Sequence, residues 1–364
     1  MSKKILIIVE DYPSSESNYP MAYVHTRNKL YLQKNKDINI SVLSFRAKKS
    51  YEWEGITVFS EKKIASFNME EFDFIVSHAP NVKNHIRFIK KKALKHITFF
   101  LHGHEVLAVN KYYPKPYFWV KEKKEFLRNI YDYFKLKIIS NVFLKNENFK
   151  FIFVSNWMKQ EAYKNLKINN LHNSYVIHNP INEIFVKNYF TETNENKKYD
   201  FITIRPLNGS KYCVDIVYKL AEKYPQYKFK IIGKGQFFKF NTKLDNIEWD
   251  NNFYKPNELI FHLNQAKVAL MPTRLDAQGV MMCELAAFGM PIITSDIPIC
   301  KEMLGSYSKS YFIDNNNPEK EFDEIVKIGD VFIPDIYSRT NLLDKFDINK
   351  IITQELNIIM DSKK

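Results

Sequence analysis

The chain has 364 residues, enough for two domains, and its hydrophobic content of 45% is ordinary for a globular protein with a proper core. Its three cysteines lack C-x-x-C spacing, which argues against a disulfide framework or a zinc site and is typical of a reducing cytoplasm. The longest apolar runs are far shorter than the roughly 18 residues of a membrane-spanning helix, and Ile5–Val9 is too short for a signal peptide. We therefore expect a cytoplasmic protein that is soluble or peripheral to the inner membrane face.

The net charge of +13 lies in the first half of the chain. Lysines and arginines minus acidic residues give 30 − 16 = +14 for residues 1–180 and 24 − 25 = −1 for residues 181–364. An excess of one sign suggests an anionic partner, and the candidates are nucleic acid, an anionic membrane and a phosphorylated acceptor. A lysine-rich composition that only serves solubility would give the same imbalance. No nucleic-acid-binding module is recognisable, so we expect no nucleic-acid partner.

Short apolar runs alternate with amphipathic stretches along the chain, which predicts repeated β-α units with parallel sheets. The strands expected in the first half are Ile5–Val9, Ile38–Leu43, Phe74–Ser77, Ile97–Leu101, Phe151–Val154 and Tyr175–Ile177. Those expected in the second half are Phe201–Ile204, Phe229–Ile232, Val268–Met271, Ile292–Thr294 and Ser310–Ile313.

A polar segment divides these two series of strands. Asn179-Pro180 is a turn signal, and Thr191–Lys198 contains no apolar residue before a new strand begins near Tyr199. We therefore predict one domain over residues 1–185, a second over residues 186–335, and a helical tail over residues 336–364.

The most informative stretch is DAQGVMMCELAAFGMP, residues 276–291. It places Asp276 in a loop after a strand, begins a helix at Gly279, and places Glu284 about one and a half turns into that helix. The first amides of the helix, those of Gly279 and Val280 among them, are suited to phosphate oxygens. Arg274 lies in the same loop, so this strand end combines carboxylates, amides and a cation.

Two other strand ends in the second half also bear candidate ligand-binding residues. Arg205 and Lys211 bracket an Asn-Gly turn, and a planar fork plus a point charge suits a diphosphate. Gly233-x-Gly235 follows the next strand, but it lacks the third glycine of the dinucleotide fingerprint. Each residue alone also has an ordinary interpretation as a solvated cation, a turn residue or a helix cap.

Taken together, this order of residues resembles the nucleotide-sugar domain of retaining GT-B glycosyltransferases, specifically glycosyltransferase family 4. The matching positions are Arg205, Lys211, Gly233, Gly235, Asp276, Glu284, Ala287, Gly289 and Pro291. Residues 153–162 (FVSNWMKQEA) and 176–182 (VIHNPIN) resemble two further family segments. The chain departs from the family at Asp276, where a glutamate is usual, at Tyr212, where a glycine is usual, and at residues 11–20, which replace a Gly-Gly turn.

The resemblance implies two Rossmann-like α/β domains facing each other across a cleft, with a C-terminal helix that crosses back to the first domain. It implies that Arg205 and Lys211 hold the donor diphosphate, and that Glu284 binds the ribose and Asp276 the sugar. The residues expected at the remaining donor contacts are Gly233, Gly235, Arg274, Gly279 and Val280. His102, in the sequence FFLHGHE, matches a family histidine that faces the reacting sugar.

The function that the resemblance implies is retaining transfer of a sugar from a UDP- or GDP-linked donor to a hydroxyl of a glycan or lipid-diphosphate-linked acceptor, in bacterial surface polysaccharide assembly. His102-x-His104 lacks a third ligand and the sequence has no Asp-x-Asp, so we expect neither a metal nor another cofactor. A nucleotide-sugar epimerase of the same fold and a non-catalytic partner of a glycosyltransferase are the alternatives. Residues 111–139 mix aromatic and cationic side chains, which indicates a lipid-facing segment, an acceptor loop or an ordinary amphipathic helix.

Overall fold

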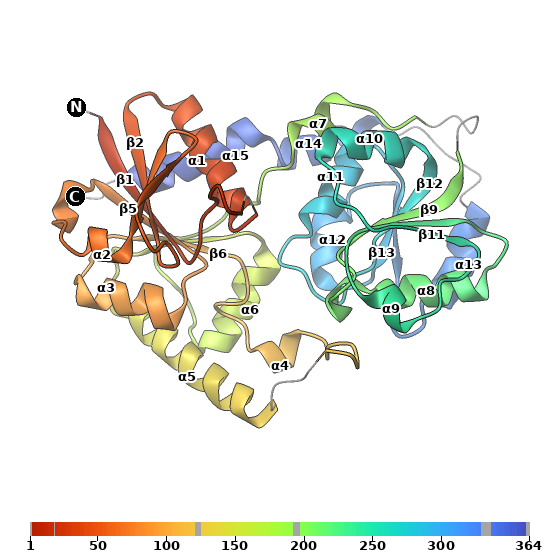
Figure 1. Ribbon diagram of the computed structural model, residues 1–364, viewed down its shortest axis with the longest axis horizontal. Helices are drawn as coiled ribbons and strands as arrows, with labels where there is room; N and C mark the ends of the chain where they lie inside the picture. Colours follow the sequence, from red (N-terminus) through yellow and green to blue (C-terminus); the bar gives the residue numbers. More distant parts are fainter. Residues whose placement is uncertain (1, 18, 121–124, 192–196, 329–335, 362–364) are drawn as a thin grey trace. The chain divides into compact units, whose positions relative to one another are not determined.

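The computed structural model describes residues 2–17, 19–120, 125–191, 197–328 and 336–361 (Figure 1). The chain forms two compact α/β units. The first unit comprises Met1–Lys111, Phe126–His178 and Asn349–Lys364, and the second comprises Tyr112–Glu125 and Asn179–Ile348. Each unit is built around one largely parallel sheet, which confirms the predicted fold class of two Rossmann-like domains.

The sheet of the first unit has eight strands in the order β3-β4-β2-β1-β5-β6-β7-β8. The strands are β1 Lys3–Val9, β2 Ile38–Ser44, β3 Tyr51–Trp53, β4 Ile56–Ser60, β5 Phe74–His78, β6 Thr98–Leu101, β7 Lys150–Phe153 and β8 Ser174–Val176. All neighbouring pairs are parallel except β3 with β4. Ile5 to Val9 in β1 are fully buried, as expected for a central strand covered on both faces.

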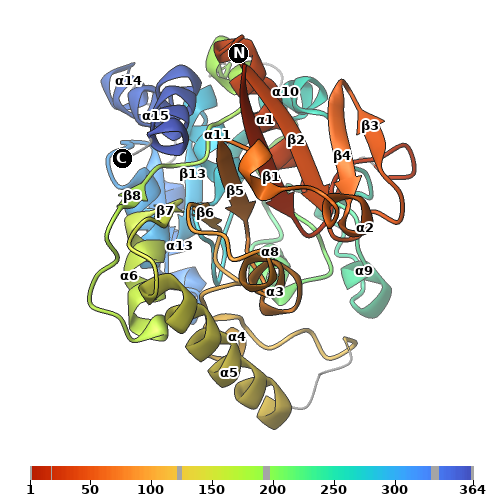
Figure 2. The same cartoon turned by 90° about the vertical axis from the view of Figure 1, so that its left-hand side faces the viewer.

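Helices connect these strands in the manner of β-α units (Figure 2). The α-helices of the first unit are α1 Ala22–Lys34, α2 Glu61–Ile64, α3 Arg87–Lys91, α5 Glu125–Leu144, α6 Asn156–Leu166 and α15 Ile348–Met360, and the short α4, Val109–Tyr112, spans the point where the chain passes to the second unit. A π-helix, Val82–Ile86, leads into α3. Among the described residues, no helix is both long and apolar enough to cross a membrane.

The sheet of the second unit has six parallel strands in the order β11-β10-β9-β12-β13-β14. The strands are β9 Tyr199–Ile204, β10 Phe229–Ile232, β11 Ile247–Asp250, β12 Ala266–Leu270, β13 Ile292–Ser295 and β14 Ser310–Ile313. The α-helices are α7 Glu183–Lys187, α8 Val214–Lys223, α9 Phe237–Phe240, α10 Pro256–Asn264, α11 Val280–Phe288, α12 Pro298–Leu304, α13 Pro318–Ile328 and α14 Ile336–Lys345. The apolar side of α8 packs with Phe229, Ile231 and Phe322 in a continuous core.

The C-terminal tail is two helices, whereas the sequence predicted one helical segment packed on the first domain. α14 belongs to the second unit, where Arg339 donates hydrogen bonds to the carbonyl oxygens of Ala287 and Val186. α15 lies almost wholly in the first unit. There the buried Glu355 accepts hydrogen bonds from Arg27 Nε at 3.1 and 3.2 Å and from the Tyr31 hydroxyl at 2.6 Å. Only the second half of the tail therefore packs on the first unit.

Two further boundaries differ from the sequence prediction. The chain enters the second unit at Asn179, rather than after residue 185, because the Asn179 amide donates to Gln278, just before α11, and the Asn182 amide donates to Glu284 in α11. Tyr112–Glu125, which the sequence placed within the first domain, is part of the second unit. Both differences concern contacts between segments that are about 100 residues apart, which local sequence patterns do not show.

Candidate functional site

The candidate site lies at the carboxyl edge of the second sheet, where the loops after β9, β10 and β12 meet. β9 lies between β10 and β12, so these three loops are neighbours. They contain, in order, Arg205 with Lys211, Gly233 with Gly235, and Arg274 with Asp276. The carboxyl edge of an open parallel sheet is the usual place for ligand binding. The structure thus brings together the second-half residues that the sequence singled out.

The two glycines after β10 let that loop pack directly on the loop after β9. At Gly233, with φ +151°, an added Cβ atom would lie 1.9 Å from the Arg205 carbonyl oxygen. At Gly235, with φ +158°, it would lie 2.6 Å from the Leu207 carbonyl carbon. The backbone amide of Leu207 also donates to the Lys234 carbonyl at 2.9 Å. Gly233 and Gly235 therefore set the position of Arg205 by close backbone packing, a role that needs no side chain at either position.

Arg205 is a buried cation without an anionic partner in the described parts of the chain. Its residue is only 5% exposed, and its Nη2 donates to the Met271 carbonyl oxygen at 3.3 Å. Its Nε is buried and has no hydrogen-bond partner among the described residues. Burying a guanidinium without a compensating charge costs several kcal/mol of free energy, and a bound anion offsets a cost of that order. The environment of Arg205 therefore favours an anionic ligand.

A second cation, Lys211, lies beside the same aromatic ring as Arg205. Lys211 Nζ is 5.2 Å and Arg205 Cζ is 5.5 Å from the centre of the Tyr212 ring. The aromatic face attracts both cations. No acidic side chain in the described ranges forms an ion pair with Lys211. Tyr212, which departs from the family's glycine, thus holds two cations whose charges are not neutralised by the protein.

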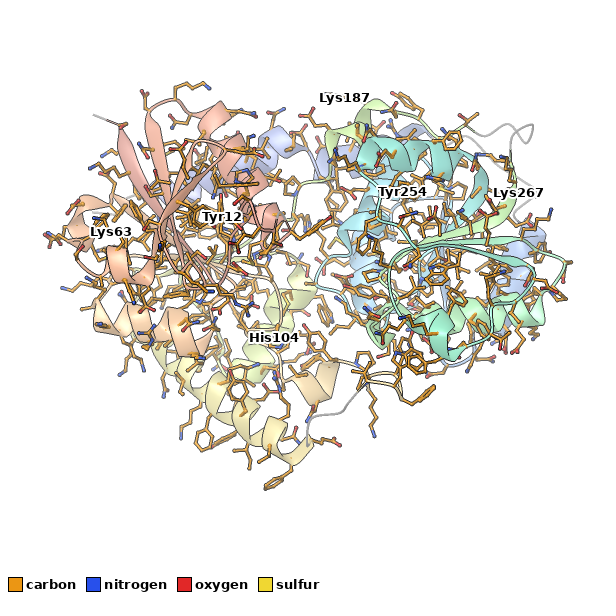
Figure 3. The ribbon with its side chains drawn as sticks, in the orientation of Figure 1. Tyr12, Lys63, His104, Lys187, Tyr254 and Lys267 are labelled. Atoms are coloured by element: carbon orange, nitrogen blue, oxygen red, sulfur yellow. The ribbon has the colours of Figure 1, made fainter. Side chains whose placement is uncertain are left out.

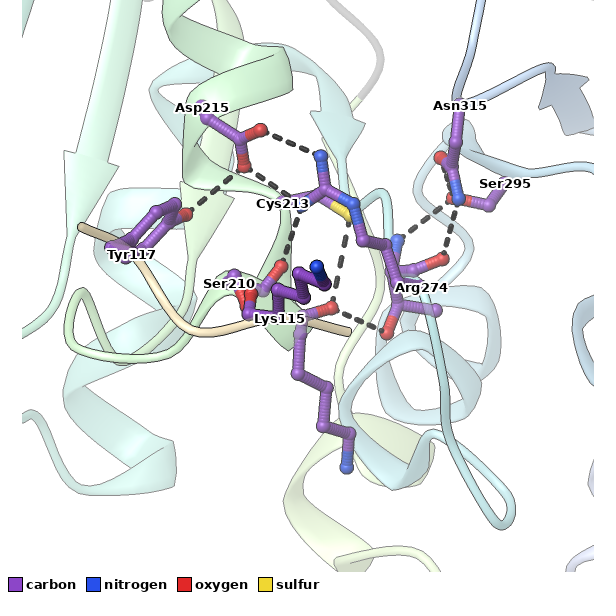
Figure 4. A network of polar contacts seen from close by, with 10 residues as sticks. Lys115, Tyr117, Ser210, Cys213, Asp215, Arg274, Ser295 and Asn315 are labelled. Atoms are coloured by element: carbon purple, nitrogen blue, oxygen red, sulfur yellow. Dashed lines mark hydrogen bonds and ion pairs between the residues drawn. The ribbon is translucent and has the colours of Figure 1, made fainter. Parts of the chain in front are cut away.

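Arg274, predicted as a donor contact, has a different environment from Arg205. Its Nη1 and Nη2 form a bidentate ion pair with Asp215 at 2.9 and 2.6 Å, and Nη1 also donates to the Ser210 carbonyl at 2.6 Å (Figure 4). Burial acts to raise the pKa of Asp215, but hydrogen bonds from Arg274 and Tyr117 hold that pKa below its usual value. The charge of Arg274 is thus neutralised within the unit, and the residue ties the loop after β12 to the start of α8.

The Asp215–Arg274 pair also anchors a segment from the first half of the sequence. The Tyr117 hydroxyl donates to Asp215 at 3.0 Å, and Ser210 Oγ donates to the Lys115 carbonyl at 2.5 Å (Figure 4). Trp119 stacks on Phe240 with ring centres 4.9 Å apart. This role was not predicted from the sequence. The signal that could have found it is the apolar and aromatic character of YYPKPYFWV, which is unusual for a solvated loop.

The loop that follows Arg274 is fixed by its own hydrogen bonds. Asp276 Oδ1 accepts from the amides of Ala277 at 2.9 Å and Gln278 at 3.5 Å, so this carboxylate closes a turn. Gly279, with φ +73°, begins α11, and Val280 is its first residue, as predicted. The first amides of a helix lack intrahelical acceptors and lie at the positive end of its dipole. The turn and helix start therefore form a site suited to anionic groups.

Glu284 lies on α11 and is 9% exposed. Its Oε1 accepts from the Asn182 amide at 3.0 Å, and burial raises the pKa of its carboxyl to about 7. Within the described residues, the Asn182 amide is the hydrogen-bond donor found on this carboxyl, and it contacts Oε1 rather than Oε2. Nearby, the Gln278 side chain bonds both backbone groups of Asn179, at 2.6 and 2.9 Å. One oxygen of Glu284 thus accepts from the protein backbone, and the other can accept from a ligand hydroxyl.

His102, the one predicted site residue of the first unit, lies at the end of β6 in a histidine pair. Its Nε2 is 3.3 Å from His78 Nδ1, and its ring meets the Tyr23 ring edge to face at 5.0 Å. Burial, and then the charge of Arg27, lower the pKa of His102 to about 3, so the imidazole is neutral at pH 7. A neutral imidazole has one donor and one acceptor nitrogen, and since Nε2 faces His78, Nδ1 is the nitrogen that can meet a ligand.

His104, two residues on, is exposed, and its Nε2 lies 3.4 Å from Arg128 Nη2 (Figure 3). Elsewhere in the first unit, the hydroxyl of the buried Tyr12 is hydrogen-bonded to His25 Nδ1 at 2.9 Å (Figure 3). The two histidines of the HGH sequence therefore have different surroundings. Within the described ranges, no group of three or more histidine, cysteine or acidic residues is placed to hold a metal ion.

Residues 187–328 match the family model described as "Glycosyl transferases group 1". The matched residues all lie within the second unit. An uncharacterized glycosyltransferase of Haemophilus influenzae is 26% identical over 163 residues, and the match spans 42% of this chain and 45% of that protein. The relative is thus matched over less than half of its own length.

Solved structures show the same fold over the whole chain. Sucrose-phosphate synthase from Thermosynechococcus elongatus aligns with a TM-score of 0.71 at 12% identity, covering 98% of each chain. A glycosyltransferase from Rickettsia africae aligns with a TM-score of 0.65 at 14% identity over 100% of each chain. An Escherichia coli trehalose-6-phosphate protein bound with UDP-2-fluoro glucose aligns with a TM-score of 0.64 at 11% identity over 99% of each chain. At these identities the likeness concerns the fold, which is that of GT-B glycosyltransferases.

Proposed function

We propose that the protein transfers a sugar from a nucleotide-diphosphate sugar to a hydroxyl of an acceptor, with retention of anomeric configuration. The observation that supports this most directly is the buried Arg205, which lacks an anionic partner among the described residues and shares the Tyr212 ring with Lys211. A third cation at the same sheet edge, Arg274, is neutralised by Asp215 and needs no ligand. Two unneutralised cations beside a helix N-terminus match the charge of a diphosphate.

In this proposal the protein acts by electrostatic stabilisation of the leaving group. Negative charge grows on the diphosphate as the glycosidic bond breaks, and Arg205 and Lys211 are already positioned to stabilise it. The amides at the start of α11 add hydrogen bonds to phosphate oxygens. Glu284 Oε2 accepts a ribose hydroxyl, and Asp276 accepts hydroxyls of the donor sugar. Since two protein cations supply the positive charge, the reaction as proposed requires no metal ion.

For the acceptor we propose a hydroxyl of a glycan or of a lipid-diphosphate-linked glycan, in bacterial surface polysaccharide assembly at the inner membrane face. The charge of +14 over residues 1–180, against −1 over the remainder, supports an anionic acceptor on the first unit. His102, neutral because its pKa is lowered to about 3, then serves as a hydrogen-bonding group toward a sugar hydroxyl rather than as a cation.

A thermal-shift screen of UDP, GDP and their sugar conjugates, followed by NMR of the product anomer, tests this proposal. The wild-type protein should be stabilised by one nucleoside diphosphate, and Lys211→Met should lose most of that shift. Lys219→Met is the matched control, because Lys219 is an exposed lysine on α8 of the same unit. Absence of any nucleotide shift would favour a non-catalytic subunit, and epimerised donor in the absence of acceptor would favour an epimerase.

A further inference from the structure

The first half of α5 exposes a continuous apolar surface. We call it the α5 aromatic face, and its residues, each between 40% and 73% exposed, are Phe126, Leu127, Ile130, Tyr131, Tyr133 and Phe134. Spacings of three and four residues place Phe126, Ile130 and Phe134 on one side of the helix. α5 lies at the outside of the first unit in both views (Figures 1 and 2). So many exposed large apolar side chains on one helix indicate an interaction surface.

The opposite side of α5 is fixed to the first unit by buried polar contacts. Asp132 accepts from the Val109 amide at 2.6 Å and forms ion pairs with Arg128 at 3.2 Å and Lys135 at 3.0 Å. The Lys135 ammonium also donates to the Leu107 carbonyl at 2.7 Å. Further along the helix this side is apolar and buried. Rotation of α5 to bury the aromatic face would break these bonds, so the face stays directed away from the core.

The charge around this helix identifies the kind of surface that fits it. Residues 126–178, the part of the first unit that contains nearly all of α5, include eight lysines and arginines and three acidic residues, a charge of 8 − 3 = +5. Phenylalanine and tyrosine bordered by lysine are typical of helices that lie in the interface of a bilayer with anionic lipids. A second copy of the chain would bring two strongly basic surfaces together, which electrostatic repulsion opposes. Anionic lipid supplies both the apolar phase and the opposite charge.

We propose that the α5 aromatic face docks the protein on an anionic bilayer surface, with the phenylalanines entering the headgroup region and exposed lysines of the same unit, such as Lys137, meeting lipid phosphates. This inference deepens the proposed function, because a lipid-linked acceptor is presented at such a surface. Only this link between the docking surface and a lipid-linked acceptor rests on the proposed function. The docking itself follows from exposure, helix fixation and charge.

Co-sedimentation of the full chain with vesicles tests the docking. The vesicles are phosphatidylcholine alone and phosphatidylcholine with phosphatidylglycerol. Wild-type protein should bind the anionic vesicles at low salt and more weakly at high salt. Phe126→Ser with Phe134→Ser should lower the partition coefficient by about tenfold or more for each substitution, since each removes a phenylalanine from the apolar phase. Phe261→Ser on α10, 65% exposed in the second unit, is the matched control and should bind like wild type.

Failure of wild-type protein to bind anionic vesicles, or equal binding by the double variant, overturns the inference. A concentration-dependent dimer in light scattering that the double variant abolishes would also overturn it, in favour of a second copy as the occupant. Nucleotide affinity is measured on the same preparations. An unchanged nucleotide Kd shows that the double variant is folded, and vesicle binding without nucleotide binding would retain this inference while removing the proposed function.

Discussion

The substitution Glu284→Gln tests the environment of the carboxylate on α11. Burial raises the pKa of Glu284 to about 7 from an ordinary value of 4.5. A raised folded-state pKa means that folding favours the protonated form, so ionisation destabilises the folded protein as the pH rises from about 4.5 to above 7. The difference corresponds to about 3 kcal/mol of unfolding free energy at about 1.4 kcal/mol for each pKa unit. Glutamine stays neutral and keeps an oxygen for the Asn182 amide, so it avoids this cost.

We therefore predict that Glu284→Gln stabilises the protein relative to wild type at pH 8, by up to about 3 kcal/mol, and that the difference becomes small at pH 5. Urea denaturation at both pH values, followed by tryptophan fluorescence, measures the difference. Glu222→Gln, at an exposed position on α8, should change stability little at either pH. If Glu284→Gln alters stability equally at pH 5 and pH 8, the carboxylate is not buried as described. The same variant should bind nucleotide more weakly, because the amide replaces the acceptor proposed for the ribose.

Three further predictions concern Tyr212, Asp215 and Glu355. Tyr212→Leu should weaken nucleoside diphosphate binding by about 1 kcal/mol in calorimetry, because it removes the ring that both cations face, whereas Tyr212→Phe should bind within about twofold of wild type; equal losses in both would assign the effect to the hydroxyl. Asp215→Asn should lower the melting temperature and raise KM for the donor, since it releases Arg274, and an unchanged KM would show that this pair does not position the site. Glu355→Ala leaves Arg27 buried without its carboxylate and should cost about 3–5 kcal/mol of stability in urea denaturation; a loss below about 1 kcal/mol would contradict the described burial.

Central strands whose side chains are buried on both faces, such as β6, β10 and β13, were predicted from their apolar runs. β10 and β14 match the predicted bounds, because their apolar runs are interrupted at both ends. β11 was missed because it is an edge strand in which Glu248 pairs with Lys230 at 2.5 Å, so charged residues alternate with apolar ones over only four positions. The hairpin of β3 and β4, which turns at Glu54-Gly55, was also missed for its short, half-exposed strands.

Candidate site residues could be predicted from the sequence, but their hydrogen-bond and ion-pair partners could not. Arg205 and Arg274 both follow a strand, and the sequence predicted a ligand contact for each. The structure distinguishes them, since Arg274 is neutralised by Asp215, which precedes it by 59 residues, whereas Arg205 has no such partner in the described ranges. Tyr117 joins Asp215 across 98 residues. Such contacts depend on how strands are ordered in the sheet, and residue type and local spacing do not contain that information.

The most direct test of the diphosphate site is calorimetric comparison of a nucleoside diphosphate with the corresponding monophosphate, in wild type and in Arg205→Met. If Arg205 and Lys211 hold the second phosphate, wild type should bind the diphosphate at least about tenfold more tightly, which corresponds to about 1.4 kcal/mol. Arg205→Met should lose most of that preference and retain its affinity for the monophosphate. Equal affinities of wild type for the two nucleotides, or an unchanged preference in the variant, would contradict the assignment of this sheet edge as the donor site.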